Sequence, residues 1–196
     1  MNWYKKATLQ ETLPYFQEFE DYGDYVPDEQ SLNTKLDTMG LSVGDEINSG
    51  DSGYAYYLSN GDVLKITTNK QEGKVAEYLV QNPHPSIAHY KNVWKEGDLY
   101  YIIMEHLDKM VVDIPALKNI FDNLKIITDS SNCFNVNCAY NIIYHDNYFN
   151  SLQPHIKDTV SGYLKHLQSI PMPVFDFLNP NNIALQDGNI KFFDIT

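Results

Sequence analysis

The carboxy-terminal segment of the sequence constrains the fold more than any other part. It contains Asp176, then Asn181 and Asn182, and it reaches Asp194 two residues before the end of the sequence. Two short apolar runs lie between the asparagines and Asp194, and an Asp-Gly pair at 187–188 separates them. This pattern predicts a β-hairpin with a two-residue turn. Such a hairpin would place the polar residues on its two sides at neighbouring strand ends.

A group of short strands with one helix among them is predicted for residues 41–107. The strands are expected at about 41–47, 54–59, 62–67, 88–94 and 99–105. Asn60-Gly61 is a strong signal for a two-residue hairpin turn between the second and third of them. The helix is expected at about 70–81, where apolar residues recur on one face, and Pro83 ends it.

The remaining segments are predicted to be helical. Residues 8–22 and 28–39 carry amphipathic patterns, and residues 108–170 are expected to form helices with a polar, Asn-rich interruption near 128–141. The expected domains are a helical extension over 1–40, a strand-rich lobe over 41–107 and a helical lobe over 108–196.

Composition limits the classes of partner. The chain has 196 residues and a formal net charge of −12, with only 14 lysines and arginines. Binding to a phosphate backbone needs clustered cations, so nucleic acid is not an expected partner. No apolar run is long enough to cross a membrane, and the first residues lack the apolar core of a secretory signal. We therefore expect a cytoplasmic protein.

Two further segments have the residue types of a phosphate site. Gly50 and Gly53 lie between the first two predicted strands, where glycine lets backbone N–H groups approach a phosphate closely. Taken alone, two glycines in a hairpin are more often an ordinary turn. Lys65 lies in an apolar strand, where a covered ammonium needs an anionic partner. The alternative is a lysine that points to water.

In their order along the chain, these segments resemble the protein-kinase-like superfamily. The resemblance includes the glycine loop 48–55, Lys65, a helix Glu, a His-Pro-x-Ile turn at 84–87, the fifth strand and hinge at 100–107 and the Asp-x-x-x-x-Asn pattern that precedes Asp194. The chain is similar to small, atypical bacterial or bacteriophage kinase-like proteins, with a shortened carboxy-terminal lobe. This resemblance implies an α+β fold in two lobes, an antiparallel amino-terminal sheet with one main helix and a short, mostly helical second lobe.

The resemblance also implies ATP and Mg²⁺ as cofactors and a role for each matching residue. Asp176 would orient the acceptor hydroxyl and take its proton, and Lys65, paired with Glu72 or alternatively Glu77, would contact the α and β phosphates. The expected nucleotide-binding residues are Gly50, Gly53, Lys65, the gatekeeper Met104 and the backbone of Glu105 and Leu107. The expected metal ligands are Asn181, which is preferred, or alternatively Asn182, together with Asp194.

Two functions follow from this resemblance. The first is ATP- and Mg²⁺-dependent phosphoryl transfer to a hydroxyl, on a protein serine or threonine or on a small molecule. The second is an inactive pseudokinase that binds nucleotide or a partner protein and transfers nothing. The second is favoured by the shortened carboxy-terminal lobe and by Leu178, which stands where the family has a lysine or histidine. Val174-Phe175 replaces the family's His-Arg, so the arginine that reads a phosphorylated activation segment is absent. For a bacteriophage protein, the expected compartment is the cytoplasm of the host.

Overall fold

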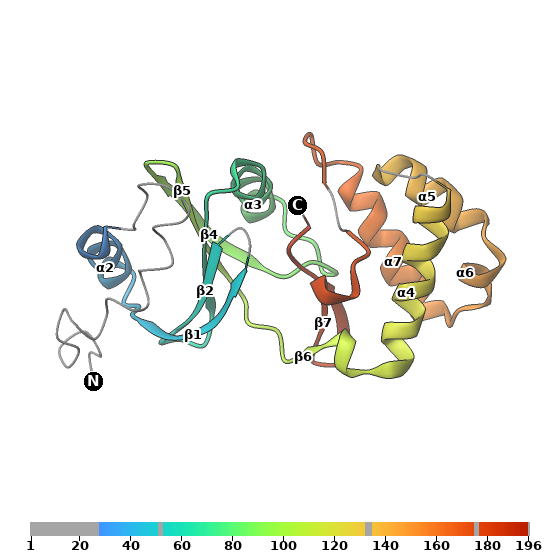
Figure 1. Cartoon of the computed structure of the whole chain (residues 1–196), viewed down its shortest axis with the longest axis horizontal. Coiled ribbons are helices and arrows are strands. Elements are labelled where there is room, and N and C mark those ends of the chain that lie inside the picture. The colour runs from blue at the N-terminus through green and yellow to red at the C-terminus, as the bar shows by residue number, and fades with distance from the viewer. Residues whose placement is uncertain (1–27, 51–52, 132–134, 175–176, 196) are drawn as a thin grey trace. The chain divides into compact units, whose positions relative to one another are not determined.

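The computed structural model describes residues 28–50, 53–131, 135–174 and 177–195 (Figure 1). Their helices and antiparallel strands confirm the predicted α+β class. The described residues form two compact units: the first holds those up to 70 together with 92–104, and the second holds 71–91 together with those from 105 onward. The helix predicted at 8–22 lies outside the described residues, and the predicted domain boundaries at 40 and 107 stay a prediction.

A five-stranded sheet is the centre of the first unit (Figure 1). Its strands lie in the order β1-β2-β3-β5-β4, so that β5 pairs with β3. Their bounds are Val43–Gly50 (β1), Gly53–Leu58 (β2), Val63–Thr67 (β3), Tyr90–Glu96 (β4) and Leu99–Met104 (β5). The predicted strands are confirmed, with small shifts at their ends.

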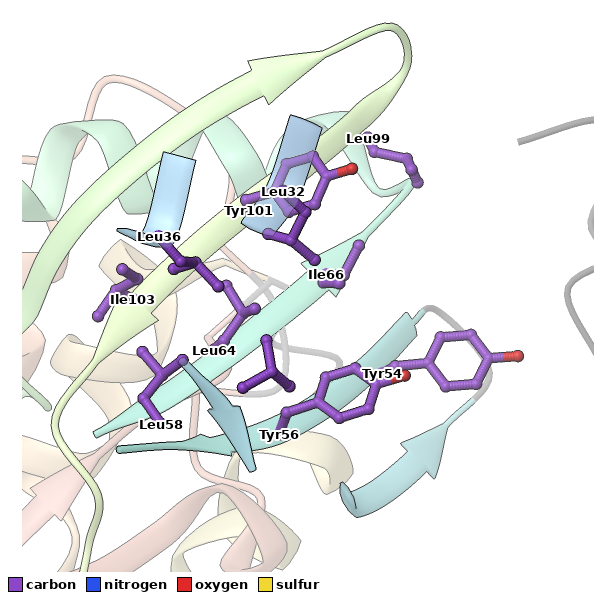
Figure 2. Packing of buried hydrophobic residues seen from close by; sticks show 11 residues of the cluster. Leu32, Leu36, Tyr54, Tyr56, Leu58, Leu64, Ile66, Leu99, Tyr101 and Ile103 are labelled. Carbon is purple, nitrogen blue, oxygen red and sulfur yellow. The ribbon is translucent and has the colours of Figure 1, made fainter. Parts of the chain in front are cut away.

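Helix α2 (Glu29–Thr38) covers one face of this sheet. Asp28 caps the helix, because its side chain accepts hydrogen bonds from the backbone N–H groups of Gln30 and Ser31. Figure 2 shows Leu32 and Leu36 of α2 directed at the side chains of the sheet. The sheet contributes alternate residues to this core: Tyr54, Tyr56 and Leu58 from β2, Leu64 and Ile66 from β3, and Leu99, Tyr101 and Ile103 from β5.

The turn between β2 and β3 differs from the prediction. The backbone N–H of Leu58 donates to the carbonyl of Asp62 over 2.8 Å, which closes a three-residue loop and not the predicted two-residue loop. The Asn60 side-chain nitrogen donates to the Asp62 carboxylate at 2.7 Å, and the Asn60 side-chain oxygen accepts from the Asp62 backbone N–H at 3.1 Å. Gly61 has a positive φ of 85°, as the third residue of such a loop requires. The side-chain bonds of Asn60 thus favour the longer loop.

Trp94 on β4 packs against the core of the first unit. Its ring stacks on that of Tyr101, with 5.0 Å between the ring centroids and 7° between the planes. Burial, together with the nearby carboxylates of Glu96 and Asp28, raises the pKa of the Tyr101 phenol to about 12. The phenol is therefore neutral at physiological pH.

The second unit is mostly helical. Its helices are α3 (Lys70–Gln81), α4 (Pro115–Ser130), α5 (Val136–His145), α6 (Asn147–Ser151) and α7 (Pro154–Leu167). Helix α5 packs against both α4 and α7 (Figure 1). The bounds of α3 match the prediction, but the interruption predicted at 128–141 is too long. Asn135 caps α5 by accepting from the Cys138 backbone N–H at 2.9 Å, so part of the Asn-rich segment starts a helix.

A small sheet accompanies these helices. It has the order β6-β7-β8, with β6 at Lys109–Met110, β7 at Ile183–Gln186 and β8 at Asn189–Phe192. The predicted hairpin is confirmed: Asp187 and Gly188 form a two-residue turn with positive φ values of 51° and 77°. The strand β6 was not predicted. Among the helices described here, none is both long and apolar enough to cross a lipid bilayer.

Candidate functional site

The open end of the β7–β8 hairpin brings Asn182 and Asp194 together. Ile183 pairs with Phe192, and the backbone N–H of Phe193 donates to the Asn182 carbonyl at 2.9 Å. The Asn182 side chain then reaches across the hairpin, where its Nδ2 donates to the Asp194 carbonyl oxygen at 2.7 Å. The hairpin thus places two predicted site residues, twelve positions apart in sequence, next to each other.

Asn181 has different surroundings. It is exposed, and its backbone N–H donates to the side chain of Asn179 at 3.1 Å within the short 3-10 helix Pro180–Asn182. Through this bond, Asn179 caps the turn. The sequence favoured Asn181 as the metal ligand, but Asn182 is the asparagine whose side chain contacts Asp194, at its backbone carbonyl.

Asp194 has an unusual backbone conformation. Its φ is +49°, in the left-handed region that non-glycine residues rarely adopt. Such a conformation costs on the order of 1 kcal/mol or more, and it persists only where the surroundings enforce it. Residues of this kind cluster at functional sites, so the conformation of Asp194 supports a role beyond packing.

Residues 86–90 run alongside the end of β8. The Ala88 backbone N–H donates to the Phe192 carbonyl at 2.8 Å, and the Phe192 N–H donates to the Ser86 carbonyl at 2.9 Å. Ile87 and Phe192 form a parallel bridge. Tyr90, which follows in this segment, lies near Asp194.

Tyr90 is a buried tyrosine next to two carboxylates. Burial, followed by the charges of Asp194 and Glu72, raises the pKa of its phenol, and a hydrogen bond with the Asp194 backbone lowers that pKa in part. Glu72 is itself 5% exposed, whereas the alternative residue Glu77 is exposed. The structure therefore groups Glu72, Tyr90 and Asp194 in the second unit. The pairing of Glu72 with Lys65 stays a prediction.

The proposed catalytic residue Asp176 lies outside the described residues, but its neighbours are held firmly. The Tyr163 hydroxyl of α7 donates to the Phe177 carbonyl at 2.9 Å, and its ring stacks on Phe192 with 3.6 Å between the centroids. Val174 and Leu178 are buried. Helix α7 and β8 thus fix the chain just after Asp176.

Two predicted site residues of the first unit, Lys65 and Met104, lie on the face of the sheet that α2 does not cover. Lys65 pairs with Ala55 on β2 and with Ile102 on β5, and Met104 lies on the same face of β5. These residues alternate with those in the core under α2, so Lys65 projects from the opposite face. Lys65 is only partly exposed. This arrangement favours the interpretation in which its ammonium needs an anionic partner.

The glycines of the predicted phosphate loop have a structural role as well. Gly50 pairs with Gly53 where β1 meets β2. A Cβ atom on Gly53 would lie 2.0 Å from the Ile66 carbonyl oxygen, so no larger residue fits there. Strand pairing alone therefore explains Gly53, and its part in phosphate binding stays a prediction.

The predicted hinge residues lie on a well-anchored segment. The Glu105 backbone N–H donates to the His89 carbonyl at 2.9 Å, and the Glu105 carboxylate accepts from the His89 N–H at 2.7 Å and from Lys191 Nζ at 2.7 Å. Within the described chain, no hydrogen bond is made by the Glu105 carbonyl or by the Leu107 backbone N–H. These are the two backbone groups expected to bind adenine. The contribution of Lys191 was not predicted, because its partner lies far away in sequence.

Oxygen ligands for a metal are few. Among the residues that the structure describes, no three His, Cys, Asp or Glu side chains lie close enough together to hold a metal ion. The side chains of Asn182 and Asp194 could supply two hard oxygen ligands, and further ligands would have to come from a phosphate and water.

No protein-family model matches the sequence, and a comparison with curated proteins finds no match. The function is therefore inferred from the residues and their geometry.

Proposed function

We propose that this chain binds ATP with Mg²⁺ and transfers the γ-phosphoryl group to a hydroxyl acceptor. The observation that carries the proposal is the contact between Asn182 and Asp194 at the open end of the β7–β8 hairpin. An amide and a carboxylate at neighbouring strand ends are the pair that a kinase-like metal site requires. The left-handed backbone of Asp194 also supports the proposal.

The donor set fits Mg²⁺ bound together with a nucleotide. The Asn182 amide nitrogen is engaged by the Asp194 carbonyl, so its Oδ1 atom is the side-chain oxygen that remains to accept. Mg²⁺ is held in such sites by one or two protein oxygens together with phosphates and waters. When bound, it would neutralise charge that develops on the phosphates.

The other residues act on the nucleotide and on the acceptor. The Glu105 carbonyl and the Leu107 N–H would bond the adenine edge, and Lys65 would hold the α and β phosphates. Asp176 would orient the acceptor hydroxyl and accept its proton. The proposal thus gives each of these groups one task that a substitution can test.

A second candidate function is nucleotide binding without transfer. Leu178, two residues after Asp176, is 3% exposed and packs into the second unit. The family has a cation at this position, which neutralises the transferring phosphate. An apolar, buried side chain supplies no such charge. This observation favours a pseudokinase that acts through binding.

A thermal-shift experiment with ATP, with and without Mg²⁺, tests nucleotide binding. We expect Mg²⁺ to increase the stabilisation of the wild type by ATP, and Asp194→Asn to remove that increase. Asp187→Asn is the matched control, because it removes the same charge at the exposed tip of the same hairpin. Equal Mg²⁺-dependent stabilisation of the wild type and Asp194→Asn would contradict the metal assignment.

Transfer is measured separately with γ-labelled ATP. Label that appears on the protein or on an added acceptor supports the kinase, and its dependence on Asp176 assigns the reaction to this site. Mg²⁺-dependent binding with no transfer of label to protein, small-molecule hydroxyls or water supports the second candidate.

A further inference from the structure

The segment from Glu105 to Asp108 is bonded at both ends to the rest of the second unit. At the first end, the Glu105 backbone N–H donates to the His89 carbonyl at 2.9 Å, and the Glu105 carboxylate accepts from the His89 N–H at 2.7 Å. At the second end, the Asp108 N–H donates to the Leu185 carbonyl of β7 at 3.1 Å. The Glu105 carbonyl and the Leu107 N–H lie between these two anchors. The segment therefore presents one acceptor and one donor in a fixed place.

Lys191 of β8 completes the anchor at Glu105. Its Nζ donates to Glu105 Oε1 at 2.7 Å and to the Ile87 carbonyl at 3.4 Å, so that one ammonium connects β8 to two neighbouring segments. The Lys191 and Glu105 side chains are mostly buried. A carboxylate covered to this extent needs a cation, because burial of an unpaired charge is costly. Without Lys191, the Glu105 carboxylate would therefore turn toward water and leave the His89 N–H.

We propose that Lys191 is a positioning residue, which holds Glu105 so that its carbonyl and the Leu107 N–H are aligned to recognise the base of the nucleotide. This inference rests on the proposed function, in which these two backbone groups bond the adenine edge. A carbonyl acceptor beside an N–H donor complements the amino group at position 6 of adenine and the acceptor nitrogen next to it. Hypoxanthine has an oxygen and an N–H at these two positions, so neither backbone group finds a partner there. Lys191 thus determines how strongly the site distinguishes the two bases.

The test compares ATP with inosine triphosphate, which carries hypoxanthine in place of adenine and is otherwise the same. Isothermal titration calorimetry with Mg²⁺ present gives the two dissociation constants, and we expect the wild type to bind ATP more tightly. Lys191→Met should reduce the ratio of the two constants about 5- to 10-fold, the factor that corresponds to one hydrogen bond. Because both ligands have the same phosphates and metal, changes elsewhere in the nucleotide site cancel in this ratio. Lys191→Arg, which keeps the cation, should restore most of the preference.

Lys109→Met is the matched control. Lys109 lies on β6 of the same small sheet, one residue after the segment, but its side chain is exposed. The substitution removes the same positive charge, and the ratio of dissociation constants should equal that of the wild type. Glu105→Gln should behave like Lys191→Met, and the double variant should lose no more than either single variant, because the two side chains act as one unit.

Amide hydrogen exchange tests the mechanical claim without a nucleotide. In Lys191→Met, the Glu105 N–H should exchange on the order of 10-fold faster relative to the Asp108 N–H. The Asp108 N–H is the internal reference, because its acceptor is the Leu185 carbonyl and not a group that Lys191 contacts. A general loss of stability would change both amides together.

Four results would overturn the inference. These are equal binding of ATP and inosine triphosphate by the wild type, an unchanged ratio in Lys191→Met, an equal decrease of the ratio in Lys109→Met, and an unchanged relative exchange rate of the Glu105 N–H. The proposed function fails by a different result, the absence of ATP binding in the wild type. In that case the exchange measurement still decides whether Lys191 holds Glu105.

Discussion

The ion pair between Lys191 and Glu105 gives the sharpest stability prediction. Lys191 Nζ lies 2.7 Å from Glu105 Oε1, and the two side chains are only 17% and 21% exposed. At this distance the Coulomb attraction is on the order of 6 kcal/mol for an effective dielectric constant of about 20, but desolvation of both groups cancels most of it. A charge-assisted hydrogen bond contributes about 1.5 kcal/mol net. We therefore expect Lys191→Met to lower the free energy of unfolding by about 1.5 kcal/mol.

The chain contains a matched control for this estimate. Lys118 and Asp122 on α4 are also a lysine–carboxylate pair, 2.6 Å apart, but their side chains are 46% and 40% exposed. Lys118→Met should cost only about 0.3–0.5 kcal/mol, because water screens the pair. Urea unfolding followed by circular dichroism measures both variants, and Glu105→Gln completes a double-mutant cycle. If Lys191→Met costs no more than Lys118→Met, burial does not strengthen this pair and the reasoning is wrong.

Three further predictions concern catalysis, pH and the core. Asp176→Ala should slow phosphoryl transfer about 100-fold or more with little change in ATP affinity; an unchanged rate together with a lower melting temperature would assign Asp176 to structure alone. His84 and His166 stack with 4.6 Å between ring centroids, and burial lowers the pKa of each below 6.5, so the unfolded chain binds protons more readily than the folded one. Stability should therefore be full above pH 6.5 and fall as the pH drops through the unfolded pKa, and melting curves of His166→Phe should show a smaller fall. Leu36 of α2 is 1% exposed, so Leu36→Ala should lower the free energy of unfolding by about 3 kcal/mol; a cost below about 1 kcal/mol in urea unfolding would mean that α2 contributes little to the first unit.

Local signals in the sequence were sufficient for most elements. The stripe of Val75, Ala76 and Leu79 and the proline that follows predicted α3, and the Asp-Gly pair at 187–188 predicted the β7–β8 hairpin. The strand β6 has only two residues, and its Lys109 pairs with Leu185 much later in the chain. No local pattern marks so short a strand, because its hydrogen bonds come entirely from tertiary structure.

The candidate site could be predicted only in part. The hairpin signal predicted that the region before β7 lies next to Asp194. The choice between Asn181 and Asn182 could not be predicted, because it depends on the short helix that directs each side chain. Tyr90 and Lys191 were not predicted as site residues. Their importance comes from the register between residues 86–90 and the end of β8, which is a tertiary contact without a sequence motif.

The stacked pair of Trp94 and Tyr101 makes the first unit optically distinct. The chain has two tryptophans: Trp94 belongs to the first unit, and Trp3 lies outside the described residues. In a Trp3→Phe variant, tryptophan emission comes from Trp94 and follows the first unit, whereas far-ultraviolet circular dichroism is dominated by the helices, and most of the described helices lie in the second unit. Superimposable denaturation curves from the two signals would show that both units unfold in one cooperative step, and separate curves would measure the stability of each. One conservative substitution thus allows the cooperativity of the two units to be measured without a label.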